Sequence, residues 1–222
     1  MPGYVLRIFH DRLPAHASAR LPALDRVVYC VGGSARCEAG GEAKAIGADE
    51  AWHGRAEATV TAGPAETTLW RWEFLPESGL RDGKLRGEGV RSRDAGAYRL
   101  NLDPQGRYLM RCDRVNFPPG GEALTHVHAG PGVRSLLKGD LYIDSGGKQM
   151  VLAPGSTWVE FGPEEVYARA SADEPTSFVR VMIIPRAYAG RSTITYTRAE
   201  DRDKPKSQQY QRYLEEPVEL RP

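Results

Sequence analysis

The sequence predicts an all-β protein built from two copies of one barrel-forming unit, and three observations lead to this prediction. Apolar residues alternate with polar ones or form short runs, as they do in strands that place one face on a core. Glycine and proline, 24 and 16 of them, recur at intervals of about ten residues and mark tight turns between such strands. The landmarks of the first half also recur, in the same order, in the second half.

The repeat is clearest between the segment 26–54 and the segment 106 residues later. A shift of 106 residues places Gly33 on Gly139, Gly40–Gly41 on Gly146–Gly147, Glu38 on Asp144 and Trp52 on Trp158. A shift of 109 residues then places Arg71 on Arg180 and Pro76 on Pro185. This ordered set indicates an internal duplication, with units of roughly a hundred residues, a common domain size.

The duplication predicts where the domains begin and end. A first barrel is expected over residues 1–76, followed by a glycine- and charge-rich linker over 77–97. A second barrel is expected over 98–197. The remaining residues, 198–222, form a polar tail that either packs on a barrel as a short helix or stays mobile.

Composition and charge argue against several classes of protein. The formal net charge is +1, which draws the chain neither to nucleic acid nor to a membrane. The apolar run Val181–Ile184 is far too short to cross a bilayer, and the N-terminus lacks the pattern of a secretion signal. The three cysteines show no CxxC spacing, so we expect free thiols and a cytoplasmic protein. No phosphate loop or dinucleotide fingerprint is present, so no organic cofactor is expected.

One segment of the second copy carries a pattern suited to metal binding. Residues 120–128 read Gly-Gly-Glu-Ala-Leu-Thr-His-Val-His, with Gly139 eleven residues later. Residues two apart on a strand point to the same side, so His126 and His128 direct both imidazoles at one point inside a barrel. A strand offers two nitrogen ligands to a divalent metal in this way.

This segment resembles the first signature of the cupin superfamily: a glycine, five residues, HxH, a glutamate and a glycine. Gly120, His126, His128 and Gly139 match that signature, and residues 153–158 resemble the start of the second one, with a serine where aspartate is usual. The resemblance implies two tandem jelly-roll (double-stranded β-helix) barrels, that is, a bicupin. The first copy has Arg20 and Pro22 at the histidine positions and is expected to be degenerate.

The second copy also departs from the family pattern. Gly132 stands where the glutamate ligand is expected and Val166 where the third histidine is expected, so two of the four ligands are missing. In one interpretation Glu160 supplies a third ligand, and two histidines and a carboxylate hold iron, manganese, nickel or zinc. In the other no metal binds, and the pocket recognises its ligand by hydrogen bonds and charge.

Two further residues are assigned to substrate binding. Arg134 shares a strand face with Gly132 and should point into the barrel, where a guanidinium suits a carboxylate or phosphate. The alternative for Arg134 is an internal ion pair with Glu160. Trp158, two residues before Glu160, is expected to line the same pocket.

These residues predict a metal-dependent cupin enzyme that acts on a small anionic organic molecule. Oxygenase, isomerase and lyase chemistry all stay open at this point. The alternative is a non-catalytic, small-molecule-binding cupin with a depleted metal site. The chain is expected to be a monomer with an intramolecular pseudo-dimer, or a homodimer.

Overall fold

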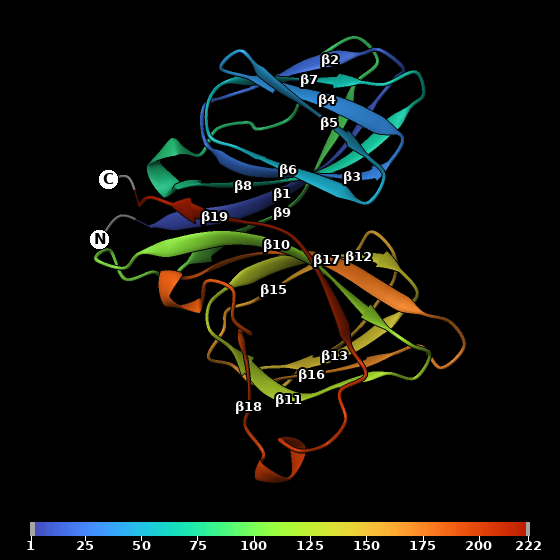
Figure 1. The fold of residues 1–222 in the computed structure, drawn as a ribbon, viewed down its shortest axis with the longest axis vertical. Coiled ribbons are helices and arrows are strands. Elements are labelled where there is room, and N and C mark those ends of the chain that lie inside the picture. Colours follow the sequence, from blue (N-terminus) through green and yellow to red (C-terminus); the bar gives the residue numbers. More distant parts are fainter. Residues whose placement is uncertain (1–2, 221–222) are drawn as a thin grey trace. The chain divides into compact units, whose positions relative to one another are not determined.

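The computed structural model describes residues 3–220, which fall into two compact units. The first runs to Gln105 and includes Leu220, and the second comprises Gly106–Glu219. Within 3–220 both units are β-sheet, and their only helical turns are η1 (Glu77–Gly79), η2 (Arg186–Tyr188) and η3 (Ala199–Asp201) (Figure 1). No described helix has the length and apolarity needed to span a membrane.

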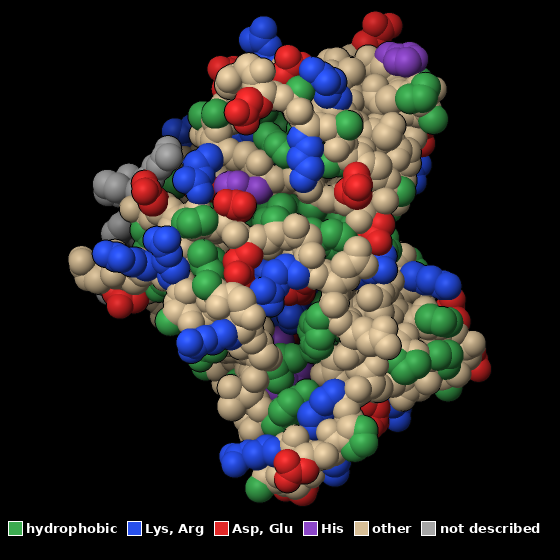
Figure 2. Space-filling view, in the orientation of Figure 1, with side chains coloured by type: hydrophobic (Ala, Val, Ile, Leu, Met, Phe, Trp, Pro, Cys, Tyr) green, Lys and Arg blue, Asp and Glu red, His purple; other side chains and the backbone are tan. Residues whose placement is uncertain are grey.

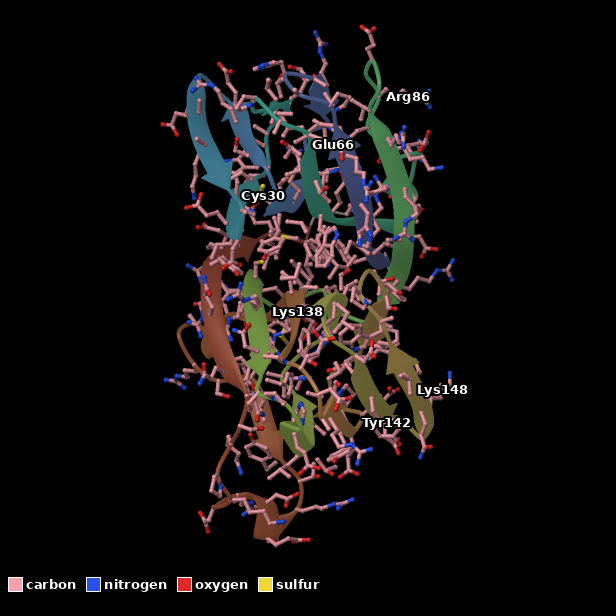
Figure 3. All side chains as sticks on the ribbon, turned by 90° about the vertical axis from the view of Figure 1, so that its right-hand side faces the viewer. Cys30, Glu66, Arg86, Lys138, Tyr142 and Lys148 are labelled. Atoms are coloured by element: carbon pink, nitrogen blue, oxygen red, sulfur yellow. The ribbon has the colours of Figure 1, made fainter. Side chains whose placement is uncertain are left out.

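The first unit packs two antiparallel sheets against each other. The five-stranded sheet has the order β6 (Glu50–Gly54), β3 (Asp25–Gly32), β8 (Thr67–Pro76), β1 (Tyr4–Leu13) and β9 (Arg91–Leu100). The four-stranded sheet has the order β2 (Ser18–Leu21), β7 (Ala58–Ala62), β4 (Ser34–Ala39) and β5 (Glu42–Gly47). An apolar cluster between them includes Leu21, Val28 and the free, buried thiols of Cys30 and Cys37 (Figure 3).

The second unit repeats this arrangement with two five-stranded sheets. One has the order β15 (Thr157–Glu160), β12 (Gly132–Lys138), β17 (Thr176–Pro185), β10 (Tyr108–Phe117) and β19 (Gln209–Val218). The other has the order β14 (Lys148–Leu152), β13 (Leu141–Ser145), β16 (Val166–Ala170), β11 (Glu122–His128) and β18 (Ile194–Tyr196). Aliphatic and aromatic side chains of both sheets, such as Leu136 and Phe178, fill the core.

The predicted duplication is confirmed by strand order and by register. Strands β6-β3-β8-β1-β9 of the first unit correspond in order to β15-β12-β17-β10-β19 of the second. Arg26 lies opposite Gly54, and 106 residues later Gly132 lies opposite Glu160. The repeated glycines serve the same turn, because Gly33 and Gly139 both adopt a positive φ, 81° and 71°. The chain therefore has the predicted all-β fold of two tandem jelly-roll barrels.

The boundaries between the units differ from those expected. Residues 91–97 of the predicted linker belong to β9, which pairs with β1, and the second unit begins at Gly106. Residues 209–218 of the predicted tail form β19, which pairs with β10 and is not a helix. Both strands lie at sheet edges and each has a single buried residue, so they lack the apolar alternation that marks the other strands.

Candidate functional site

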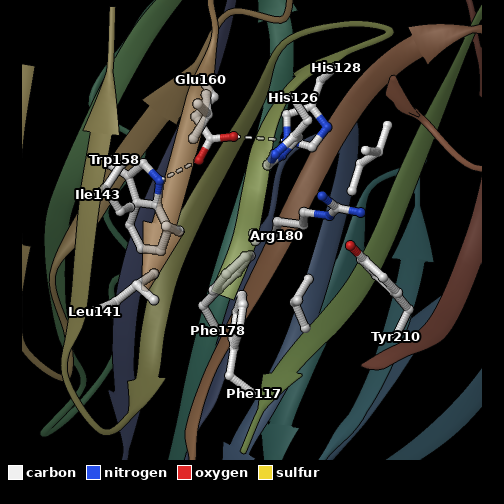
Figure 4. A pocket seen from close by; sticks show the side chains of 15 residues that line it. Phe117, His126, His128, Leu141, Ile143, Trp158, Glu160, Phe178, Arg180 and Tyr210 are labelled. Atoms are coloured by element: carbon white, nitrogen blue, oxygen red, sulfur yellow. Dashed lines mark hydrogen bonds and ion pairs between the residues drawn. The ribbon is translucent and has the colours of Figure 1, made fainter. Parts of the chain in front are cut away.

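Two histidines and a glutamate meet inside the second unit. His126 and His128 come from β11, Glu160 comes from the end of β15, and all three side chains are buried. The two Nε2 atoms of the histidines lie 3.2 Å apart, and Nε2 of His128 lies 3.0 Å from Oε2 of Glu160 (Figure 4). The structure thus brings together the three side chains that the sequence predicted as metal ligands.

The local structure of β11 decides which way the histidines face. The pairing of β11 with β16 shifts register between Ala123 and His126, which is a β-bulge that adds one residue to β11. Nδ1 of His126 lies 2.7 Å from the carbonyl oxygen of Leu124. Because a carbonyl oxygen only accepts, Nδ1 is the protonated nitrogen, and Nε2 of His126 keeps its lone pair and faces Nε2 of His128.

The bulge also corrects one sequence-based correspondence. We expected Arg20 and Pro22 at the places of His126 and His128 in the first unit. In the first unit Leu21 pairs with Ala58. Ala58 is the counterpart of Val166, because it pairs with β4 as Val166 pairs with β13, and Val166 is the partner of His126. Leu21 is therefore the counterpart of His126. A constant shift along the sequence indicates the wrong residue because it does not account for the extra residue in β11.

Glu160 is held by three partners. Nε1 of Trp158 donates a hydrogen bond of 2.9 Å to Oε1, and Nη2 of Arg134 lies 2.5 Å from Oε2, the oxygen that also meets His128. Nη1 of Arg134 donates to the carbonyl oxygen of Gly132 at 2.6 Å. Arg134 thus points into the barrel as predicted, and it makes the internal ion pair with Glu160 that was its alternative role.

The environment fixes the charge of these groups near neutral pH. Burial by itself raises the pKa of Glu160, but Arg134 and His128 outweigh that effect and hold this pKa below its usual range. Burial lowers the pKa of His126, and it lowers the pKa of His128 to about 3 despite the nearby carboxylate. The site therefore presents two neutral imidazoles and one carboxylate, the protonation states that metal coordination requires.

The donor set suits a divalent metal in kind, and two of its donor separations are close to those expected around one ion. Two ligand atoms at about 2.1 Å from one ion and at right angles to each other lie about 3.0 Å apart. The two measured separations, 3.2 Å and 3.0 Å, are close to this value. Nδ1 of His128 is buried and has no hydrogen-bond partner, so no hydrogen bond at this atom fixes the orientation of the ring. Within 3–220, however, no group of three or more His, Cys, Asp or Glu side chains is arranged so that it could hold a metal ion as it stands.

A small cavity of about 20 Å³ adjoins these groups. It has room for about one water molecule or ion. Its polar lining consists of His126, His128, Glu160, Arg180, Tyr210 and the indole of Trp158. Trp158 lines the cavity as expected, whereas Arg134 is not among the described residues that line it.

Sequence reasoning missed Arg180 as a residue of the site. Arg180 is buried on β17; its Nε donates to Oδ1 of Asp113 at 2.5 Å, and its Nη2 donates to Oδ2 at 3.3 Å. Figure 4 shows its guanidinium between the two histidines and Tyr210. From the sequence, Arg180 was identified only as the counterpart of Arg71. Arg180 shares a strand face with the buried Phe178 and Met182, and a charged residue in such a position itself indicates a functional or paired group.

Comparison with known proteins adds the fold family. Neither the protein-family models nor the curated proteins give a significant match. Solved structures do: a variant of oxalate decarboxylase from Bacillus subtilis has a TM-score of 0.66 at 11% identity and covers 86% of this chain and 71% of its own. Salicylate 1,2-dioxygenase from Pseudaminobacter salicylatoxidans has a TM-score of 0.54 at 13% identity, covering 79% and 70%. Procruciferin, an 11S globulin from Brassica napus, has a TM-score of 0.61 at 8% identity, covering 80% and 75%.

This chain has the cupin fold. The resemblance predicted from the spacing of Gly120, His126, His128 and Gly139 is therefore confirmed. Two of the similar proteins are named as enzymes and one as a globulin, so cupins of this shape do different things. The function of this chain therefore depends on its own site.

Proposed function

We propose that this cupin is a metal-dependent enzyme that acts on a small, anionic organic molecule. His126, His128 and Glu160 would hold a divalent ion, which can be iron, manganese, nickel or zinc. The observation that carries the proposal is the convergence of the three donor atoms at separations of 3.2 Å and 3.0 Å inside a buried cavity. A bound ion of this kind polarises a substrate oxygen or activates water, and several of these metals also support oxygen chemistry.

The surrounding residues have supporting tasks in this proposal. The carbonyl of Leu124 fixes the His126 ring so that Nε2 faces the site, and the indole of Trp158 fixes one oxygen of Glu160. Arg134 neutralises Glu160 until an ion takes over that role. Oxygenation, isomerisation and bond cleavage are all compatible with two imidazoles and one carboxylate, and the substrate decides among them.

The similar enzymes support a small organic acid as the substrate. Two of them are named for oxalate and salicylate, and a variant of the dioxygenase is known in complex with gentisate. All three molecules carry carboxylate groups. Arg180, which lines the cavity beside the two histidines, would meet such a group.

A second candidate is a non-catalytic, small-molecule-binding cupin. The ion pair between Arg134 and Glu160 favours it, because this pair already satisfies the carboxylate without a metal. Gly132 and Val166, which replace two expected ligands, also favour it.

Metal titration separates the two candidates. We expect chelator-treated protein to take up one equivalent of Mn²⁺, Fe²⁺, Ni²⁺ or Zn²⁺, measured by calorimetry and by elemental analysis after gel filtration. His126→Ala should weaken this uptake at least about a hundredfold with little loss of folding. His16→Asn is the matched control, since His16 is an exposed histidine with a φ of 63°, which asparagine tolerates. If wild-type protein retains none of these ions after reloading, the non-catalytic candidate is correct.

A further inference from the structure

A second, larger cavity of the second unit adjoins the one beside the histidines. Its volume is about 330 Å³, against about 20 Å³ for the inner cavity. Arg180, Ile194 and Tyr210 line both, so the two cavities are neighbours at these residues. The inner cavity is too small for any organic molecule, whereas the outer one falls within the usual range for small-molecule sites.

The outer cavity is rich in arginine. Four guanidinium groups line it, from β10, β17, the segment before β18, and β19: Arg111, Arg180, Arg191 and Arg212. A hollow with basic side chains around it and histidine in its depth is visible on the face shown in Figure 2. This gathering of positive charge is local, because the formal net charge of the whole chain is only +1.

The carboxylates near these arginines do not balance them. Arg111 pairs with Glu215, Arg180 pairs with Asp113, and Arg212 lies 3.8 Å from the same Glu215. None of the ion pairs among the described residues involves Arg191. Four positive groups thus face two carboxylates, and two positive charges are left over.

The positive groups also lie at different depths. Arg180 is buried where the two cavities meet, with Asp113 holding its Nε and Nη2, while Arg191 and Arg212 are exposed at the surface. The buried walls around Arg180 lower the local dielectric and strengthen its attraction for an anion. A ligand with a negative group at each end would satisfy both positions, whereas a single anion would satisfy one.

We propose that this arginine-lined cavity binds the substrate and that the substrate is a small dicarboxylate. One carboxylate meets Arg180 and the hydroxyl of Tyr210 next to His126 and His128, and the other meets Arg191 and Arg212 at the entrance. This assignment rests on the proposed function only in calling the ligand a substrate, because the binding site itself does not require a metal. It also moves the task of anchoring the anion from Arg134 to Arg180, because Arg134 is committed to Glu160.

Binding of simple dicarboxylates to the full chain tests the proposal. Malonate and succinate are titrated by calorimetry into chelator-treated and metal-loaded protein at low ionic strength, beside butyrate, which has one carboxylate, and succinamide, which has none. We expect succinate or malonate to bind at least about tenfold more tightly than butyrate, with no binding of succinamide. The affinity should fall as sodium chloride is added.

A charge-matched pair of variants locates the site. Arg191→Gln combined with Arg212→Gln should weaken dicarboxylate binding about tenfold or more. Lys148→Gln combined with Arg186→Gln removes two exposed positive charges elsewhere on the second unit and should change it less than about twofold. Equal effects of the two pairs, or equal binding of succinate and butyrate, would overturn the proposal.

The two proposals fail in different ways. Dicarboxylate binding to chelator-treated protein, together with no metal uptake on reloading, would leave this binding site standing and remove the metal-dependent enzyme. Metal uptake dependent on His126, with no binding of malonate or succinate to either form, would do the reverse.

Discussion

The two barrels of this chain have arginines at corresponding positions, but the surroundings of these arginines differ. Arg71 of the first unit and Arg180 of the second are equivalent through the register of β8 and β17. Arg71 donates to Asp11, contacts Glu73 and lies over the ring of Phe9. Arg180 has Asp113 as its carboxylate partner and lines two cavities.

The space around Arg71 is closed by the chain itself. Nη2 of Arg71 donates to the carbonyl oxygen of Gly83 at 2.8 Å, and Nη1 of Arg7 donates to the carbonyl oxygen of Arg81 at 2.6 Å. Leu85, a few residues on, packs into the apolar core of the first unit. The segment 81–85, part of the predicted linker, therefore fills this region of the first barrel.

This difference shows how one fold yields a packed barrel and an open one. A buried guanidinium is costly unless it has partners, so the barrel supplies them either from its own chain or from a ligand. The partners of Arg71 in the first unit are Asp11, Glu73 and the carbonyl oxygen of Gly83. Arg180 in the second unit has Asp113 as its ion-pair partner, and we propose that a dicarboxylate adds a further one.

The largest expected effect comes from opening the closed network of the first unit. Glu73 pairs with Arg7 and Arg71, and it also faces Arg26 across the strand pair. Glu73→Gln should therefore lower the free energy of unfolding by about 3–5 kcal/mol, measured by urea denaturation. The exposed Glu38→Gln serves as the control and should cost less than about 0.5 kcal/mol. A loss below about 1 kcal/mol for Glu73→Gln would mean that the network is not what closes this barrel.

A smaller effect is expected in the open barrel, where Arg134→Met leaves Glu160 without its cation. Trp158 and His128 still contact Glu160, so we expect a loss of about 2–3 kcal/mol in chelator-treated protein. Because the carboxylate is then free for an ion, metal should stabilise this variant more than it stabilises the wild type. Thermal unfolding with and without metal measures both the loss of stability and the stabilisation by metal. Equal stabilisation of the two proteins by metal would contradict the assignment of Glu160 as a ligand.

The smallest effect tests the close fit of the segment 81–85. A Cβ added at Gly83 would lie 2.6 Å from the Phe9 ring and would contact the Arg7 guanidinium. Gly83→Ala should cost about 1–2 kcal/mol by urea denaturation, since the segment has to move outward. Gly79→Ala is the control, because its nearest neighbour would be 3.9 Å away. If both variants unfold at the same urea concentration, the segment does not close the barrel tightly.

The sequence by itself determined the barrel fold and the duplication, and it predicted four of the groups in the site. The four groups follow from local rules: alternation places His126 and His128 on one face of a strand and Arg134 on the face of Gly132. Glu160 stands out as a carboxylate within an apolar strand. The ion pair of Arg134 with Glu160 was one of two alternatives for Arg134, and the structure shows it, with Gly132 directly opposite Glu160.

Only the tertiary structure decided the rest. The bulge in β11 exchanged Arg20 for Leu21 as the counterpart of His126, because an added residue changes strand pairing without leaving a mark in the apolar pattern. The edge strands β9 and β19 are recognised by their pairing partners, since they are too polar to show a buried face. The cavities at Arg180 exist because side chains from several strands leave space between them, and such space depends on packing across the barrel, which no stretch of sequence records.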